Sequence, residues 1–161
     1  MSPASSESPA GQPVSTSLVS SLSHIAIAVP DLAAAVAALE QRLGFAAGPV
    51  HENKQQGVRL CYIDLGNARI ELIAPLGPSS PISRFLERNP AGGLHHVAFN
   101  VGDLDSALAA AVGAGARQAG APGLNVHGER IAFLGPRELA GALVELEERH
   151  AAGHLSPTAA V

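Results

Sequence analysis

The chain has 161 residues, a net charge of −4, one cysteine and few aromatic residues, a length that suits one domain with a sizeable core. Its basic residues are scattered singly, so no basic stripe could follow a phosphate backbone, and we expect no nucleic-acid partner. One cysteine excludes an internal disulfide, and no apolar run reaches the length of about 20 residues that crosses a bilayer, so we expect a cytoplasmic protein without membrane contact.

Both ends of the chain differ in composition from its middle. The N-terminal stretch is rich in serine, proline and alanine and lacks the features of a signal peptide. We therefore expect a disordered tail over residues 1–20, a single domain over 22–149 and a flexible tail over 150–161. Within the domain we expect a first module over about 22–75, a linking helix over about 80–89 and a second module over about 94–149.

The first module opens with an alternating strand, "LSHIAIAV", in which larger apolar residues alternate with His24 and two alanines. Pro30 ends this strand, Asp31 can cap a helix, and the apolar face of that helix stops at Gly44. Two strands should follow, over Val58–Leu65 and Ala68–Ala74, with room for another around Val50. The segment "SSPISRFLERN" then predicts a short capped linking helix.

The second module repeats this pattern at an offset of 72 residues. "LHHVAFNVGDLDSALAAA" aligns with "LSHIAIAVPDLAAAVAAL", so that His96 matches His24. The pattern predicts a helix that begins at Leu104 and strands over Arg130–Leu134 and Leu143–Glu147, with room for a further strand near Gln118. Two such modules, each too small to bury its own apolar face, should pack against each other.

The repeat also pairs candidate functional residues. His24 and His96 lie on first strands, and Glu71 and Glu145 lie on last strands. A lone histidine or glutamate on a strand is more often a surface or satisfied polar residue. Both residue types recur in register, however, and imidazole and carboxylate are good ligands for a divalent metal, so we predict a metal site between the modules. His95, whose side chain should point away from His96, has no such counterpart and is interpreted as structural.

Several segments resemble one known family. They are "LSHIAIAVPDL", "QQGVRLCYIDLGNARIELIAPLGPSSPISRFLERNPAGGLHHVAFNVGDLDSAL", "GERIAFLGP" and "GALVELEE". Together they are similar to the methylmalonyl-CoA epimerases of the vicinal oxygen chelate superfamily. The resemblance implies an α+β fold in which two βαβββ modules in tandem form an open, partly closed barrel-like sheet around a metal, and commonly a homodimer.

The resemblance also implies a chemistry. Its expected metal ligands are His24, Glu71, His96 and Glu145, and the expected ion is Co²⁺, with Mn²⁺ or a similar ion as the alternative. The implied reaction interconverts (2R)- and (2S)-methylmalonyl-CoA, an acyl-CoA substrate of propionate metabolism, through a metal-stabilised enolate, with Glu145 as the base.

The chain departs from the family pattern at three places. Leu60 stands where some members have a second carboxylate, Gln55 replaces a usual glutamate, and "FLGPREL" replaces "FLHPK". Arg137 in that last segment keeps a positive charge that could contact a phosphate or carboxylate of the substrate. A second proton-transfer group would have to be another residue or a metal-bound water, and the candidates are Glu71, Glu52, His51 and Tyr62.

Three other functions stay open at this point. The chain could be an epimerase of another acyl-CoA, a glyoxalase I type isomerase that acts on a glutathione adduct, or a non-catalytic small-molecule-binding member of the superfamily. The retained ligand set argues against the binding protein, and the long "IELIAPLGPSSPISRFLERN" segment argues against the glyoxalase.

Overall fold

The structure, a computed structural model, describes residues 17–149. Most of the predicted N-terminal tail, residues 1–16, and the predicted tail over 150–161 lie outside the described residues. Both predicted modules lie within them. The elements, in chain order, are β1 (Ser21–Ala28), α1 (Leu32–Leu43), β2 (His51–Asn53), β3 (Val58–Asp64), β4 (Arg69–Pro75), α2 (Ser83–Arg88), β5 (Gly93–Val101), α3 (Leu104–Gly113), β6 (Gly123–Leu124), β7 (Arg130–Leu134), a 3₁₀ turn (Pro136–Glu138) and β8 (Val144–Glu148).

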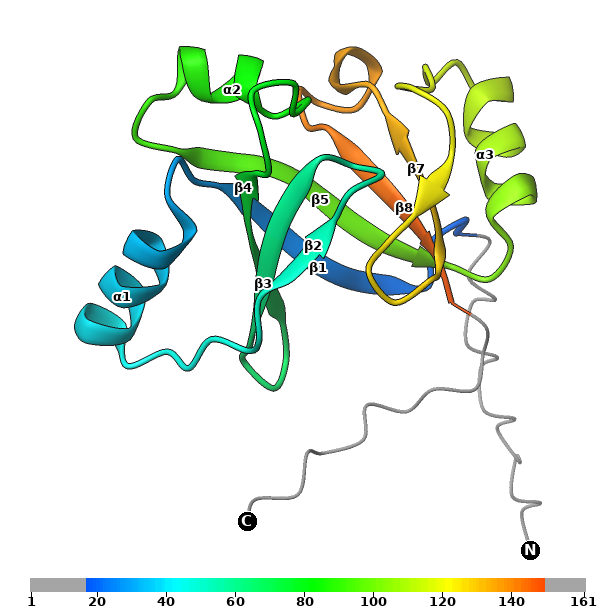
Figure 1. Cartoon of the computed structure of the whole chain (residues 1–161). Helices are drawn as coiled ribbons and strands as arrows, with labels where there is room; N and C mark the ends of the chain where they lie inside the picture. Colours follow the sequence, from blue (N-terminus) through cyan, green and yellow to red (C-terminus); the bar gives the residue numbers. More distant parts are fainter. Residues whose placement is uncertain (1–16, 150–161) are drawn as a thin grey trace, which may run out of the picture.

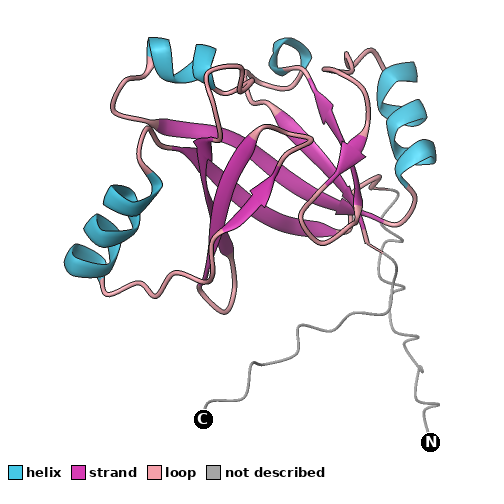
Figure 2. Ribbon diagram, viewed as in Figure 1, coloured by secondary structure: helices cyan, strands magenta, loops and turns pink. Residues whose placement is uncertain are grey.

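The eight strands form one sheet in the order β2-β3-β4-β1-β5-β8-β7-β6. The first strands of the two modules, β1 and β5, pair antiparallel at its centre, and each pairs parallel with the last strand of its own module. The sheet curls strongly, as Figures 1 and 2 show. Its two edges meet where Nδ2 of Asn53 donates to the carbonyl of Leu124 over 2.9 Å. The predicted pair of βαβββ modules in an open barrel is thus confirmed.

The two longer helices begin and end as the sequence predicts, for local reasons. The side chain of Asp31 accepts a hydrogen bond from the Ala34 N–H, and Asp103 does the same for Ser106, so each aspartate satisfies a free amide in the first turn of its helix. Gly44 ends α1 in the left-handed conformation, with φ of 69°. Within residues 17–149, no helix is both long and apolar enough to span a membrane.

Packing separates the two faces of the sheet. The helices α1 and α3 lie against the convex face at opposite ends of the sheet and bury apolar side chains there, among them Leu32, Leu72, Leu104 and Leu146. A third apolar cluster lies on the concave face and includes Leu60, Ile73 and Ile82. Small side chains, Ala26, Ala28 and Ala98, line the central strands on the concave side and leave room above them.

Three local predictions need correction. The further strand of the second module is β6 at Gly123–Leu124, whereas Gln118 makes only an isolated bridge to Leu134. The linking helix α2 begins after Ile82 and has no side-chain cap. The last strands of the two modules, β4 and β8, each begin and end one residue later than predicted. A two-residue strand has no alternating pattern from which it could be read.

Candidate metal centre

Strand pairing brings the four predicted ligand residues to the same place. In the parallel ladder of the first module Glu71 pairs with Ala26, and in that of the second module Glu145 pairs with Ala98. Each glutamate therefore lies beside the central strand of its own module, close to the histidine of that strand. All four side chains point to the concave face, and all four are buried.

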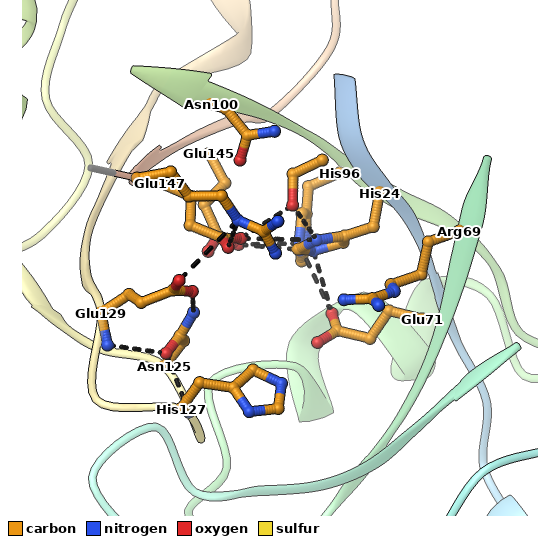
Figure 3. A network of polar contacts seen from close by, with 12 residues as sticks. His24, Arg69, Glu71, His96, Asn100, Asn125, His127, Glu129, Glu145 and Glu147 are labelled. Atoms are coloured by element: carbon orange, nitrogen blue, oxygen red, sulfur yellow. Dashed lines mark hydrogen bonds and ion pairs between the residues drawn. The ribbon is translucent and has the colours of Figure 1, made fainter. Parts of the chain in front are cut away.

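The two imidazole rings meet at their Nε2 atoms, which lie 3.3 Å apart. Oε2 of Glu71 lies 3.5 Å from Nε2 of His24 and 3.7 Å from Nε2 of His96. Oε2 of Glu145 lies 2.9 Å from Nε2 of His96 and 3.9 Å from Nε2 of His24. Figure 3 shows the two rings between Glu71 on one side and Glu145 on the other. The structure thus brings together all four residues that the repeat paired.

This donor set fits a divalent cation. His24, Glu71 and His96 offer ligand atoms that all lie within 4.8 Å of one another, and Glu145 reaches both rings. Atoms that bind one metal ion at about 2.1 Å lie roughly 3–4 Å from one another, so the spacing needs little change. Two imidazoles and two carboxylates suit Zn²⁺, Co²⁺, Mn²⁺ and similar ions. Burying these ionisable groups side by side would otherwise be costly.

The charges of the four groups depend strongly on burial and on one another. Burial opposes protonation of His24, but the hydrogen bond and charge of Glu71, together with Glu145 and Glu147, raise its pKa. Burial lowers the pKa of His96 to about 4. Burial also raises the pKa of Glu145 to about 8, against the charge of His24. Without a metal, His24 and Glu145 therefore hold their protons up to a higher pH than a free histidine and glutamate do, and a bound cation would displace these protons.

An extra residue precedes each of the two histidines. The pairing of β1 with β5 shifts register by one residue at two places, so that Ser23 on β1 and His95 on β5 have no partner in the ladder. Oγ of Ser23 lies 3.1 Å from Nδ1 of His24, and Nδ1 of His95 lies 2.9 Å from Nδ1 of His96. The prediction that the side chain of His95 points away from His96 is therefore wrong, because the bulge breaks the alternation on which it depended.

A pocket of about 500 Å³ opens above the four side chains. This volume suits a small organic ligand. One wall is apolar and includes Val58, Leu60, Ile73 and Ile82, while Lys54 and Gln55 contribute polar groups. Leu60 is buried in this wall, so a hydrocarbon side chain occupies the position where some family members have a second carboxylate.

The pocket narrows the choice of further proton-transfer groups. Glu71 and Tyr62 line it, whereas His51 and Glu52 do not. Burial and the nearby charge of Glu71 raise the pKa of Tyr62, and its hydroxyl is hydrogen-bonded to Glu71, so Tyr62 acts as a donor and not as a base. Arg137 is exposed on the 3₁₀ turn and is not among the pocket residues, so its contact with substrate stays a prediction.

One residue beside the cluster was not singled out from the sequence. Glu147 is buried two residues after Glu145 on β8, and its Oε2 lies 3.7 Å from Nδ1 of His24. The signal was present, because side chains two residues apart on a strand share a face. The segment "LVELE" therefore places both carboxylates on the concave side.

The comparisons with known proteins agree with this geometry. The sequence model of the Glyoxalase/Bleomycin resistance protein/Dioxygenase superfamily matches residues 23–133. The ethylmalonyl-CoA/methylmalonyl-CoA epimerase of Cereibacter sphaeroides is 44% identical over 133 residues, which cover 81% of this chain and 99% of that protein.

Solved structures of similar proteins share the fold. The methylmalonyl-CoA epimerase of Mycobacterium tuberculosis has a TM-score of 0.76 at 33% identity, covering 84% of this chain and 91% of its own. A methylmalonyl-CoA epimerase in complex with methylmalonyl-CoA and NH₄⁺ has a TM-score of 0.73 at 32% identity, covering 83% and 96%. The duplicated module, the buried cluster and these likenesses agree, and the chain belongs to the methylmalonyl-CoA epimerase family of the glyoxalase/bleomycin resistance protein/dioxygenase superfamily.

Proposed function

We propose that the protein is a metal-dependent epimerase that interconverts (2R)- and (2S)-methylmalonyl-CoA. The observation that carries this proposal is the convergence of two buried histidines and two buried glutamates at a pocket in a chain that is 44% identical to an ethylmalonyl-CoA/methylmalonyl-CoA epimerase. The pocket is large enough for the acyl group and the start of the pantetheine arm.

His24, Glu71, His96 and Glu145 would hold a divalent cation, with Co²⁺ as our first choice and Mn²⁺ as the alternative. Such an ion supplies positive charge next to the thioester oxygen, where negative charge develops when C2 loses its proton. His24 and His96 would offer Nε2 to the ion, since these two atoms face each other inside the cluster. The side chains of the protein carry out the rest of the chemistry.

Glu145 is the proposed base. Burial raises the pKa of its carboxyl group to about 8 in the metal-free protein, so this carboxylate is a stronger base than an exposed glutamate and is suited to accept the C2 proton. A carboxylate has two oxygens, so one oxygen of Glu145 could bind the metal while the other accepts the proton. Glu71 is the proposed partner for the opposite face, because it lines the pocket and is held by His24 and Tyr62. The apolar wall around Leu60 excludes water from the reacting carbon.

The apolar wall also favours a second candidate substrate. Leu60 and Ile73 offer hydrocarbon where a polar side chain would oppose a longer alkyl group, and the Cereibacter sphaeroides relative is named for ethylmalonyl-CoA as well. The same reaction on 2-ethylmalonyl-CoA is therefore a second candidate. Comparing kcat/KM for the two thioesters under identical conditions decides which one the pocket prefers.

Isotope exchange tests the proposed reaction. The protein, loaded with Co²⁺, is incubated with (2S)-methylmalonyl-CoA in D₂O, and deuterium at C2 and the stereochemistry of the thioester are followed. We expect deuterium incorporation together with racemisation, and we expect EDTA to stop both until Co²⁺ is restored. A protein that binds the thioester without exchange is a binding protein. Turnover of a glutathione hemithioacetal in its place would indicate a glyoxalase.

We also propose that the protein is a cytoplasmic homodimer. Leu22 and Leu94 occupy equivalent positions in the repeat and are 42% and 72% exposed. Between α1 and α3 the convex face carries half-buried Ile25, Val97 and Phe99. An apolar strip of this kind supports contact with a second copy of the chain. A cytoplasmic location agrees with Cys61, which is buried and free.

A further inference from the structure

Glu147 is a buried carboxylate for which the proposed reaction has no direct use. It is 3% exposed and lies on the concave face of β8, two residues beyond Glu145. Its Oε2 approaches Nδ1 of His24 and not Nε2, the atom that faces the cluster. Glu147 therefore lies behind the ring of His24, outside the group of atoms that would bind a metal. Figure 3 shows Glu147 next to Glu145, on the side of the rings opposite Glu71.

Ser23 connects Glu147 to His24. The hydroxyl of Ser23 donates to Oε2 of Glu147 over 2.9 Å, and the same Oγ lies 3.1 Å from Nδ1 of His24. A hydroxyl has one donor and can also accept, so Ser23 accepts the Nδ1–H of His24 while it donates to the carboxylate. This arrangement requires the bulge at Ser23, because strict alternation would turn the hydroxyl to the convex face.

The hydrogen-bond chain selects one tautomer of His24. If Nδ1 carries the hydrogen, Nε2 has a free lone pair, and that atom faces His96, Glu71 and Glu145. The imidazole is then presented to a metal in its binding form and in a fixed ring orientation.

Glu147 is itself held in place. Nε of Arg149 lies 3.2 Å from its Oε1 and 3.8 Å from Oε1 of Glu129, so the guanidinium holds the two carboxylates together. Glu129 is in turn fixed by Nδ2 of Asn125 over 2.8 Å. These contacts leave the carboxylate little freedom to leave Ser23. The ring of His96 lacks such a support, since its Nδ1 meets the imidazole of His95.

We propose that Glu147 is a positioning residue: acting through Ser23, it holds the ring of His24 with Nε2 directed into the cluster and thereby strengthens the binding of metal at the site. This role rests on the proposed metal site. It assigns Glu147 no contact with substrate.

The test measures Co²⁺ affinity directly, by competition with a chromophoric chelator, on the full chain after removal of metal. Glu147→Gln keeps the size of the side chain and removes its charge. We expect Co²⁺ to bind about 10–100-fold more weakly, with a changed visible absorption band, as for other carboxylates that support a ligand histidine. Exchange at C2 should return at saturating Co²⁺, because Glu147 does not touch the substrate.

Glu148→Gln is the matched control. Glu148 is the next residue on β8 and is also buried, but its Oε1 accepts from the Leu104 N–H at the start of α3. This variant should unfold at a lower temperature while its Co²⁺ affinity stays within about threefold of wild type, a change far below the one expected for a lost supporting carboxylate. Equal weakening in the two variants would show a general loss of stability and would overturn the proposal.

Two substitutions at Ser23 complete the test and replace Glu147→Gln if that variant does not fold. Ser23→Ala removes the bridging hydroxyl and should weaken Co²⁺ binding, whereas Ser23→Thr keeps the hydroxyl and should retain it. Wild-type affinity in folded Glu147→Gln or in Ser23→Ala contradicts the positioning role. A wild-type protein that exchanges C2 deuterium but binds no Co²⁺ overturns the positioning role and the metal site while leaving the epimerase reaction intact.

Discussion

Glu71 and Glu145 occupy equivalent positions in the two modules, yet their carboxyl groups ionise differently. Burial opposes ionisation of both, but at Glu71 the interactions with His24, His96 and Tyr62 together outweigh burial and lower the pKa. At Glu145 burial dominates, and the pKa rises to about 8. Two carboxyl groups with diverging pKa values mark a division of roles. Of the two groups, Glu145 is the stronger base for removing the C2 proton, and Glu71, once protonated, is the stronger acid for returning a proton on the opposite face.

The substitution Glu145→Gln tests this division. It removes the proton acceptor but keeps a side chain of the same size, so we expect C2 deuterium exchange to fall by at least about 100-fold at saturating Co²⁺. Glu52→Gln is the control, because Glu52 is exposed on β2 and does not line the pocket. Activity near the wild-type level in Glu145→Gln would remove Glu145 from the role of base.

The raised pKa values of His24 and Glu145 predict how metal binding depends on pH. Both groups hold protons at pH 6 in the metal-free protein, whereas His95 and His96, with pKa values of about 4, do not. A cation must displace these protons, so Co²⁺ affinity should rise by at least about tenfold between pH 6 and pH 8. Chelator competition at several pH values measures the slope. Glu145→Gln should flatten it, and an unchanged slope in that variant would assign the protons elsewhere.

The turn before β5 requires a close approach between its own backbone and the backbone at the end of β1. Gly92 has φ of 85°, and a Cβ at this position would lie 2.5 Å from the carbonyl oxygen of Ala28. That contact lies between the end of β1 and the start of β5, the two strands that join the modules. The peptide chains can come this close because no side chain separates them.

Gly92→Ala should therefore lower the free energy of unfolding by about 1–3 kcal/mol, from the left-handed conformation and the clash together. Gly93→Ala is the matched control, since its Cβ would make only an ordinary contact of 3.7 Å with Phe85. Urea unfolding of both variants measures the difference. Equal stabilities would mean that the turn rearranges without cost.

The sequence predicts elements better than it predicts irregularities within them. The alternation around His24 and His96 and the spacing of Glu71 and Glu145 were enough to locate the cluster, because regular strands keep a period of two. An extra residue such as Ser23 looks like any other residue in that pattern, so neither bulge could be predicted. The sequence does place Glu147 on the same face as Glu145. Its proposed role in orienting His24, however, depends on Ser23 and hence on the bulge.

At the level of the whole molecule, the duplicated modules leave a continuous apolar strip on the convex face. Helices α1 and α3 cover the two ends of that face, and Leu22 and Leu94 remain exposed between them. The two leucines lie near opposite ends of the β1–β5 ladder, with half-buried Ile25, Val97 and Phe99 between them, so one partner surface along the ladder could cover both. This supports the proposed homodimer.

Leu94→Glu should convert the dimer to a monomer, because it places a charge at the centre of the proposed contact. Leu124→Glu is the control: Leu124 is 45% exposed but lies on β6, at the edge of the sheet. Light scattering coupled to size exclusion gives the mass of each variant. A wild-type protein that elutes as a monomer would rule out the proposed dimer.

The two bulges have a consequence for folding as well. On the concave face the β1–β5 ladder carries small alanine side chains, so packing on that face specifies the register of the two strands only weakly. Strands of this kind can pair in a shifted register. Here Ser23 and His95 interrupt the β1–β5 pairing on either side of a three-pair stretch centred on Ile25 and Val97. If the strands paired in a shifted register, the two extra residues would have to be accommodated at two other positions of the ladder. The bulges therefore help to fix the register of the strand pair that joins the two modules.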